Sequence, residues 1–277
     1  MKTTFHILTL YFVCQFLVLA DPLTESTFTE VIQQVNTLTP DGSANSAKLA
    51  DVLKSPDRVR TGPLSRAELT APDKTITRVG ANTVFSFADH GRTLNLEQGS
   101  LLFHTPKGLG GGTIKSGGAS AAVLGTTLMV SCTSHGGFKV ILLEGKGSVS
   151  LANGQSVVLL AGQMVYVSPG GTKFSATLKI NLGKLVGGSH LINGFSHDLS
   201  SLPLIQTAIH DQNAQIAAGG LADTGLMADN YLRQRMPGNG LDAQDHGAYQ
   251  TDMSSTLMVA GGTQIVGEAG GREYSAP

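Results

Sequence analysis

The stretch Thr61-Gly-Pro-Leu-Ser-Arg-Ala-Glu-Leu69 decides the interpretation of this chain. Its first three residues are typical of a turn, because proline restricts φ. The alternation that follows places Ala67 and Leu69 on one face of a strand and Arg66 and Glu68 on the other. Arg66 and Glu68 are therefore either exposed recognition residues or a solvated, mutually paired face. Surface ion pairs are the commoner case, so we expect the second arrangement.

Five short segments with recurrent strand and turn features follow this stretch. They are Arg78-Val-Gly-Ala-Asn-Thr83, Leu94-Asn-Leu-Glu-Gln-Gly-Ser-Leu101, Val123-Leu-Gly-Thr-Thr-Leu-Met-Val130, Leu143-Glu-Gly145 and Leu160-Ala-Gly-Gln-Met164. In this order and spacing, the set resembles the FecR domain, the periplasmic sensory module of the iron-dicitrate regulator family. The resemblance runs from about Glu30 to Ser168. It implies a binding or signalling module and not a catalyst.

The residues of these family motifs are expected to be mainly structural. Gly99 and Gly145 close apolar runs, where a turn with positive φ suits glycine. Gly125 lies inside a strand pattern and predicts a bulge or a close backbone approach. The full set comprises Thr61, Gly62, Ser65, Arg66, Ala67, Glu68, Leu69, Gly99, Gly125, Thr126, Glu144, Gly145, Gly162 and Gln163.

The first 20 residues are typical of a secretory signal peptide. Lys2 supplies a short positive region, Ile7 to Leu19 is an almost unbroken apolar run, and Val18-Leu-Ala20 is a small-residue cleavage site. The apolar run has about 13 residues, fewer than the roughly 20 that span a bilayer. We therefore expect cleavage after Ala20 and an exported protein, periplasmic or extracellular. A retained membrane anchor is the alternative.

The resemblance also sets an expectation about signalling. In the FecR family, the domain lies outside the inner membrane, behind a membrane span and a cytoplasmic segment that binds a sigma factor. There it senses the occupied state of an outer-membrane transporter. In this sequence we find no cytoplasmic segment, no retained span and no tryptophan. We therefore expect a stand-alone exported domain, for which the resemblance does not by itself predict sigma-factor regulation.

Apolar and turn patterns predict a mainly β domain over residues 21–175, built as an antiparallel β-roll or sandwich. Asn153-Gly154, between two alternating runs, is a strong hairpin signal. The core is expected to centre on Val123, Leu128, Val130 and the run Val140 to Leu143. The expected strands are Ile76 to Phe87, Thr93 to His104, Ala121 to Thr133, Phe138 to Leu143, Ser148 to Leu151, Ser156 to Leu160 and Met164 to Val167.

The rest of the chain has a different composition. Residues 176–217 predict a short helical cap, with one helix from Leu182 and a second that begins near Ser201 and has Pro203 in its first turn. These helices are expected to close the open end of the β domain or to pack on one of its faces. Residues 218–277 are rich in glycine and poor in apolar residues, which predicts a mostly disordered tail.

The net charge argues against nucleic acid and anionic membranes as partners, and the cysteine content argues against thiol chemistry. Without Lys2 the 19 basic residues become 18, against 20 acidic residues, a net charge of −2. No overall field therefore draws the protein to nucleic acid or to an anionic membrane. Cys132 is the one cysteine that follows the signal segment. We expect it to be a small buried hydrophobe and not a reactive thiol.

The sequence contains no pattern that predicts an enzyme, a cofactor or a metal site. The glycine-rich stretch Lys107 to Thr113 lacks the spacing of a phosphate-binding loop and predicts a flexible connection. No G-x-S-x-G elbow is present. The histidines show no metal-ligand spacing. They stand at His90, His104, His135, His190, His197, His210 and His246 after the signal segment.

Two functions from different classes remain open. The first is a non-catalytic binding or sensory module that docks an envelope protein through a strand edge or a sheet face. The edge is expected near Glu30 to Val35 or Met164 to Val167. The second is a structural envelope component that assembles with itself or with a surface polymer. An apolar patch beside an open edge strand would favour docking of a protein.

Overall fold

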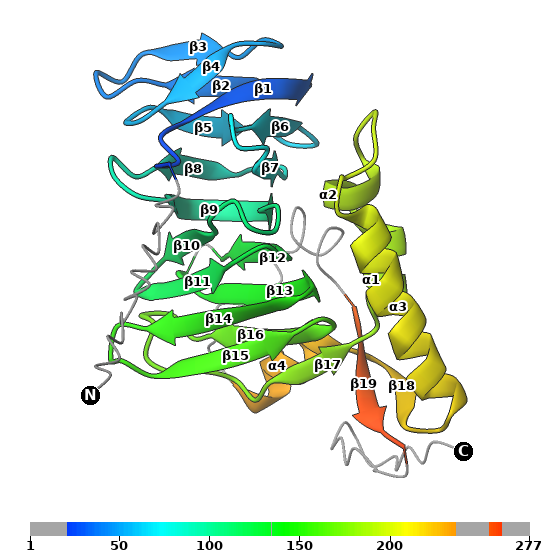
Figure 1. Cartoon of the computed structure of the whole chain (residues 1–277). Coiled ribbons are helices and arrows are strands. Elements are labelled where there is room, and N and C mark those ends of the chain that lie inside the picture. The colour runs from blue at the N-terminus through cyan, green and yellow to red at the C-terminus, as the bar shows by residue number, and fades with distance from the viewer. Residues whose placement is uncertain (1–20, 134, 237–254, 262–277) are drawn as a thin grey trace, which may run out of the picture.

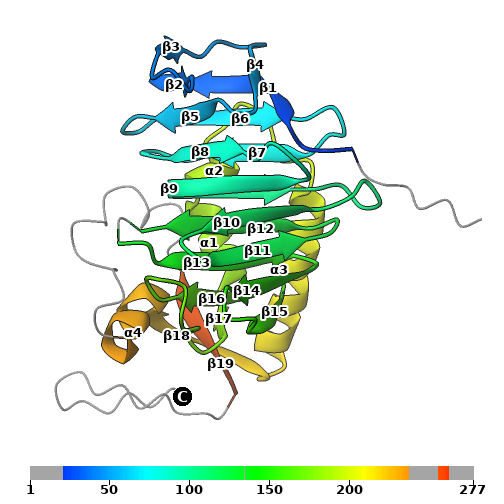
Figure 2. The ribbon, with the colours of Figure 1, turned by 90° about the vertical axis from the view of Figure 1, so that its left-hand side faces the viewer.

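The computed structural model describes residues 21–133, 135–236 and 255–261. Two β-sheets face each other across a common core, and helices cover the outer face of one of them (Figure 1). The strands are stacked from β1–β4 at one end of the molecule to β15–β17 at the other (Figure 2). The mainly β, sandwich-like fold expected from the sequence is confirmed.

The sheet that carries the helices, called sheet A here, contains antiparallel pairings throughout its described strands. Part of β9 lies between β7 and β12. In spatial order the other strands are β4 (Val52–Lys54), β1 (Glu25–Ile32), β6 (Arg66–Thr70), β7 (Ile76–Val79), β12 (Thr127–Cys132), β13 (Phe138–Glu144), β16 (Gln163–Val167), β17 (Leu178–Ile180), β19 (Thr256–Ala260) and β18 (Leu221–Met227).

The opposite sheet, sheet B, has an outer face that no helix covers in the described part of the chain (Figure 1). Its pairings are antiparallel except for that between β9 and β10, which is parallel. Part of β9 lies between β8 and β10. The other strands, in spatial order, are β3 (Ala44–Ser46), β2 (Val35–Leu38), β5 (Arg58–Thr61), β8 (Val84–Phe87), β10 (Gly112–Ser116), β11 (Ala119–Val123), β14 (Lys146–Leu151) and β15 (Ser156–Leu160).

The long strand β9 (Thr93–His104) belongs to both sheets. Its first half pairs with β8 in sheet B, and its second half pairs with β7 and β12 in sheet A. The two halves meet at Gly99, whose φ is +94°. A Cβ atom there would collide with Thr83, so only glycine fits this bend.

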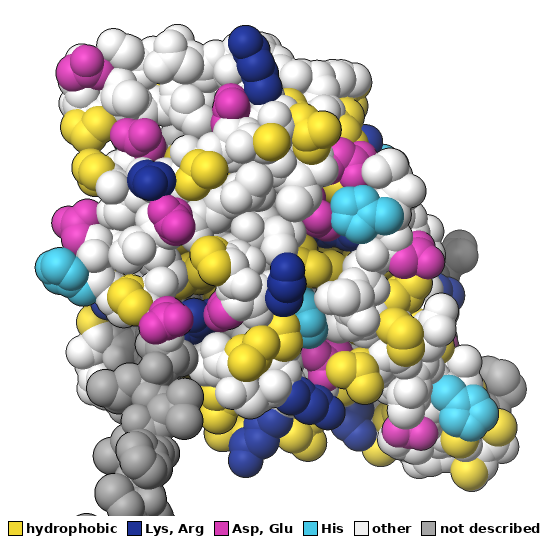
Figure 3. Space-filling view, turned by 45° about the horizontal axis from the view of Figure 1, so that its top comes forward, with side chains coloured by type: hydrophobic (Ala, Val, Ile, Leu, Met, Phe, Trp, Pro, Cys, Tyr) yellow, Lys and Arg dark blue, Asp and Glu magenta, His cyan; other side chains and the backbone are white. Residues whose placement is uncertain are grey.

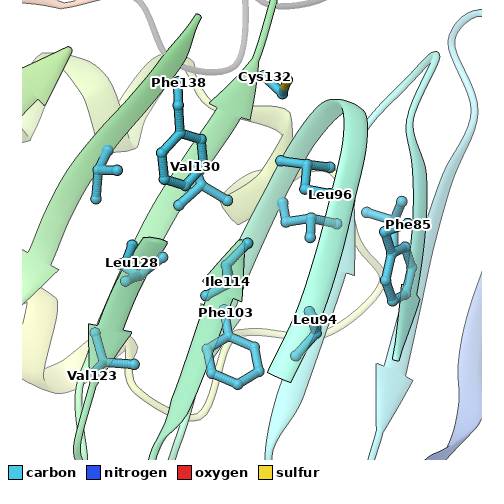
Figure 4. Close-up of a cluster of buried hydrophobic side chains, with 14 of the residues drawn as sticks. Phe85, Leu94, Leu96, Phe103, Ile114, Val123, Leu128, Val130, Cys132 and Phe138 are labelled. Carbon is cyan, nitrogen blue, oxygen red and sulfur yellow. The ribbon is translucent and has the colours of Figure 1, made fainter. Parts of the chain in front are cut away.

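The core lies between the two sheets and contains most of the residues expected there. Leu128, Val130, Val140 and Leu142 all belong to it, and Figure 4 shows Leu128 and Val130 beside Val123 and Phe138. The expected continuous strand from Ala121 to Thr133 is wrong, because β11 ends at Val123 and β12 begins at Thr127.

The helical cap packs on the outer face of sheet A, which confirms one of the two expected positions. It contains α1 (Leu182–Gly188), α2 (His190–Asn193) and α3 (Leu202–Ala217). Asn181 caps α1 by accepting a hydrogen bond from the Lys184 backbone, and proline stands in the first turn of α3. Leu185, Leu191 and Ile205 join Met129 and Ile141 of the sheet in a second hydrophobic cluster.

The expected tail contains three regular elements where the structure describes it. These are β18, α4 (Ala228–Arg235) and β19. β19 pairs with β17 and β18, so it extends sheet A beyond β17. For these residues the expectation of disorder is wrong, because α4 and β19 bury Leu232 and Leu257 against the cap cluster. The rest of the expected tail lies outside the described residues.

None of the helices in the described ranges is both long and apolar enough to cross a bilayer.

Candidate functional site

The start of the decisive stretch forms a tightly bonded turn. The Thr61 hydroxyl donates to the Gly80 carbonyl at 2.6 Å and accepts from the Thr83 backbone N–H at 2.9 Å. The Ser65 hydroxyl accepts from the Gln34 backbone N–H at 3.1 Å. A side chain at Gly62 would collide with Gln34. These contacts fix the conformation of the turn.

Glu68 and Arg66 do not form the solvated pair expected from the sequence. Both lie on the face of sheet A that the cap covers. Glu68 is buried and accepts a hydrogen bond from Arg78 Nε at 2.8 Å, while Arg66 Nε donates to the Gly194 carbonyl at 3.2 Å. Ala67 and Leu69 point into the core as expected.

The cap segment completes a polar junction around Glu68. His197 Nε2 lies 2.9 Å from Glu68 Oε1, and its Nδ1 lies 3.4 Å from Glu30 Oε2. Arg78 lies 4.3 Å below the ring centroid of Phe195. Burial alone would raise the pKa of Glu68, but hydrogen bonds from Thr29 and Arg78 and the charges of Arg78 and His197 lower it overall. The junction holds the carboxylate in its charged form and fastens the cap to the sheet.

A second polar cluster lies under the beginning of α3. Thr127 Oγ1 lies 2.9 Å from His104 Nδ1, 2.9 Å from Glu144 Oε1 and 2.8 Å from Ser201 Oγ. Burial raises the pKa of Glu144 and lowers the pKa of His104. The cluster lies between the strands of sheet A and the start of α3. It joins β9, β12 and β13 to the cap.

The glycines of the later motifs stand at turns. Gly125 and Gly145 have φ values of +66° and +75°, and a Cβ at Gly125 would lie 2.9 Å from the Lys107 backbone. The close approach expected at Gly125 is therefore present. Gly162 also has positive φ, and Gln163 accepts a hydrogen bond from the Leu160 backbone N–H at 2.9 Å. Thr126 is buried beside the turn at Gly145, and its methyl group faces that glycine.

A hollow of about 610 Å³ lies where β9 leaves sheet B. Cys132, which is 3% exposed, forms part of its wall together with Glu97, Lys115 and Ser116. Glu97 is held by an ion pair with Arg58 at 3.2 Å. Burial of the thiol agrees with the expected role of Cys132 as a small hydrophobe. Within the part of the chain that the structure describes, no three metal-ligating side chains converge.

The last strand of sheet B has an unpaired outer edge. β15 pairs with β14 on one side, and no described strand pairs with its other side. The Leu151 N–H donates to Gln155 across the hairpin. Because bonded pairs alternate along an antiparallel ladder, the backbone groups of Ser156, Val158 and Leu160 point away from β14. The Leu160 N–H already donates to the Gln163 side chain. Val158 therefore presents the central free N–H and C=O groups of the edge.

The predicted edges differ from this one. Met164 to Val167 lies inside sheet A, between β13 and β17, and Val167 also bridges to Phe174. The prediction of an edge there is wrong, because segments that follow in the chain cover β16. At the other predicted position, Glu30 pairs through β6, and its carboxylate accepts from the Ser196 backbone N–H at 3.0 Å. This contact lies on the face of the sheet. β4 pairs only with Glu25 to Thr27 of β1, so among the described residues no strand pairs with the outer side of Glu30 to Ile32, and the predicted edge is present there.

Comparison with known proteins supports the family resemblance. The model of the FecR protein family matches residues 57–147. These residues are a FecR region. No curated protein matches the chain. The FecR region extends from β5 into the start of β14, so the cap and the open edge of β15 both follow it in sequence.

Two solved structures also resemble the chain. Both are crystal structures of a putative anti-sigma factor from Parabacteroides distasonis ATCC 8503. They show 18% and 19% sequence identity to this chain and a TM-score of 0.39. In each case the alignment covers 44% of this chain and 59% of that chain. The chain therefore spans less than two thirds of the length of these structures.

Proposed function

We propose that this FecR-containing protein is a non-catalytic sensory or binding module that receives an extended segment of a partner protein along β15. The match to the FecR family supports a signalling role. The open edge of β15 is the observation that carries the mode of binding. An extended peptide that lies along such an edge continues the sheet and satisfies its free backbone groups.

The two ends of the paired sheets support this choice of edge. At the same end of the molecule, sheet A continues beyond β16 into β17, β19 and β18, whereas sheet B stops at β15. Val158 and Leu160 are each 52% exposed on the outer face of this strand. An exposed apolar edge strand is normally protected in a monomeric protein. A partner strand is the protection that we infer for β15.

The motif residues support a role without catalysis. Thr61, Ser65 and Glu68 bond to neighbouring backbone or to a buried arginine, as described above. In the cluster of His104, Thr127 and Glu144, burial lowers the pKa of the histidine and raises the pKa of the glutamate, and Thr127 bonds to Ser201 at the start of α3. These groups stabilise the turn and the cap. This arrangement supports a structural role for these residues and a binding role for the β-domain surface.

We also propose that the protein is exported and begins at Asp21 after signal cleavage. The support is the sequence pattern of the first 20 residues. Intact-mass measurement on protein from native cells tests this proposal. A mass that starts at Asp21 is expected. A mass that still includes Met1 to Ala20 would indicate a retained anchor.

The edge is tested by Val158→Pro, which removes the central outward N–H without touching the bonds to β14. Val158→Thr is the matched control, because it keeps the N–H and a β-branched side chain. Each protein is used to capture partners from native envelope extract. We expect wild type and Val158→Thr to retain the same proteins and Val158→Pro to lose them, at equal urea midpoints. Equal capture by Val158→Pro would refute docking on this edge.

Self-assembly through the same strand is the second candidate. The segment Ser156-Val-Val-Leu-Leu160 carries no charge, so two copies of it could pair without direct repulsion between side chains of the strands. Light scattering at increasing concentration distinguishes this function. A dimer that Val158→Pro converts to monomer would support it.

A further inference from the structure

We propose that the segment received by β15 is acidic, and that it is read by a basic and apolar rim around that strand. This inference rests on the proposed edge function and adds the chemistry of the partner. The rim is defined by Lys107, Lys146 and Lys179 together with Leu124, Val158 and Leu160, each of which is exposed.

The first support is an uneven distribution of charge along the chain. Residues 21–104 contain 10 acidic and 8 basic residues, whereas residues 105–180 contain six lysines and a single acidic residue. That acidic residue is Glu144, which is 4% exposed. Of the six lysines, Lys139 is buried and paired with Asp229, which leaves five exposed lysines in this part of the chain. The whole-chain balance hides this difference, because the other acidic residues lie in other parts of the sequence; of these, Asp229 pairs with Lys139 and Asp223 with Lys184.

The surface shows the same separation of charge. In Figure 3, acidic and basic side chains are interspersed over the upper part of the visible face. Lysine and arginine side chains gather with hydrophobic ones at its lower edge. Fixed charge of one sign beside an apolar strip attracts a partner of the opposite sign and orients it.

A continuous path of neighbours joins the rim to the strand. A Cβ at Gly125 would contact Lys107, and Leu124 precedes Gly125 directly. Lys146 lies beside Leu160 in the β14–β15 ladder. The Leu160 backbone bonds to Gln163, which pairs with Lys179 of β17. Lys146 is therefore the lysine directly beside the end of β15, Lys179 follows through Gln163 in sheet A, and Lys107 lies farther away, near the end of β11.

The free backbone of β15 favours a polypeptide over other anionic partners. Val158 presents an N–H and a C=O group with strand spacing, and another extended chain provides the complementary groups. A lipid surface or a nucleic acid binds lysines but leaves these backbone groups without matching partners. Val158 and Leu160, alternate residues of the strand that are each 52% exposed, are available for apolar side chains of the guest strand.

The same charge distribution argues against a second copy as the guest. Two copies joined through β15 would bring two lysine rims together, and like charges facing each other oppose association. An acidic guest turns that cost into attraction. The lysine rim therefore favours an acidic partner segment over a second copy of this chain, whereas an uncharged edge would accept either.

Two synthetic peptides test the inference. Both alternate valine and threonine; one carries glutamates at its ends, and the other carries lysines at the same positions. Binding to the full protein is measured by fluorescence anisotropy at about 0.05 M and about 0.5 M salt. We expect roughly tenfold tighter binding of the acidic peptide at low salt and loss of that preference at high salt.

Variants of the protein test where the peptides bind. Lys146→Glu is expected to reverse or abolish the preference for the acidic peptide. The matched control is Lys48→Glu, which changes an exposed lysine between β3 and β4 and should preserve the preference. Val158→Pro should weaken the binding of both peptides. Anionic vesicles of phosphatidylglycerol serve as the competing probe.

The outcomes distinguish the preference for an acidic partner from the location of binding on β15. Equal binding of both peptides, with binding lost in Val158→Pro, would keep the edge and overturn the acidic partner. Binding of the acidic peptide that persists in Val158→Pro would overturn the placement on β15. Vesicle binding that depends on Lys146 but not on Val158, without binding of either peptide, would identify a lipid-binding rim and overturn the proposal.

Discussion

Arg78 and Glu68 form an ion pair that is closed to solvent. Nε of Arg78 donates to Oε2 of Glu68 at 2.8 Å, and the two side chains are 0% and 2% exposed. The same guanidinium donates to the carbonyls of Ile192 and His197 at 2.8 and 2.9 Å. One side chain of sheet A therefore supplies hydrogen bonds both to a neighbouring strand and to the cap.

Replacing Arg78 by methionine should be strongly destabilising. The change leaves the buried Glu68 carboxylate without its main partner and removes the bonds to the cap. Loss of one member of a buried pair costs about 3–5 kcal/mol. Urea unfolding measures this loss. Lys54→Met, which breaks an exposed pair with Glu25, is the control and should cost less than about 1 kcal/mol. Equal midpoints for both variants would contradict this assignment.

Glu68 should also make stability fall in acid. Its folded-state pKa is lower than the ordinary value of 4.5 because the hydrogen bonds and charges around it outweigh the effect of burial. A group with a lowered folded pKa stabilises the fold above its unfolded pKa and loses that contribution as the pH falls through the folded value. We expect the stability advantage of wild type over Glu68→Gln to shrink below about pH 4.5. A constant difference between pH 7 and pH 3 would argue against it.

Glu144 should show the opposite dependence. Burial raises its folded-state pKa above 4.5, and the hydrogen bond from Thr127 and the charge of Lys107 offset this only in part. Its contribution to stability is complete below the unfolded pKa and is lost as the pH rises through the folded pKa. Glu144→Gln should therefore gain stability relative to wild type between about pH 4 and pH 7. Parallel stability profiles over this range, measured in urea, would contradict the shift.

Leu142 should be a large contributor to the core. Its side chain is 1% exposed and faces β14, where a Cβ at Gly147 would lie 3.2 Å from its Cδ1. Leu142→Ala should reduce the free energy of unfolding by about 2–5 kcal/mol. Leu124→Ala removes the same atoms from an exposed site and should change it by about 0.5 kcal/mol or less. Coincident urea midpoints for wild type and Leu142→Ala would show that the core is misplaced.

Asp229 should be required for docking of α4. Its carboxylate accepts from Lys139 Nζ at 3.0 and 3.1 Å, and the lysine side chain is 3% exposed. Asp229→Asn keeps the shape but leaves a buried ammonium group without its counter-ion, which costs about 3–5 kcal/mol. Hydrogen exchange should show faster exchange in α4. The double variant Lys139→Met, Asp229→Leu should restore protection, since an apolar pair avoids the unpaired charge. Failure to restore it would assign another role to Lys139.

Local sequence features predicted the parts of the fold that depend on near neighbours. Asn153-Gly154 is the turn between β14 and β15, and Gly99 and Gly145 have the positive φ values expected of them. Pro203 stands in the first turn of α3. In each case the preference is set by the residue itself and its immediate neighbours. The division into a β domain and a helical cap follows from the same local periodicity.

The environment of Glu68 could not be predicted in this way. Alternation correctly placed Arg66 and Glu68 on one face of β6, but it could not show that a segment more than 120 residues later covers that face. The same limit applies to β16, which β17 covers, and to β19, which lies in the stretch expected to be a mostly disordered tail. Pairing between distant segments depends on tertiary contacts that periodicity does not encode.

The sequence by itself determined the strand-rich class, the turns and most of the core, because side-chain size, alternation and glycine conformation act locally. Tertiary structure alone decided which sheet face the cap covers, which carboxylates are buried and which strands, β15 among them, are left at an open edge. The rim around β15 shows the reason most directly. Lys107, Lys146 and Lys179 are far apart in the chain, and their charges act together only because the strands between them are stacked into sheets.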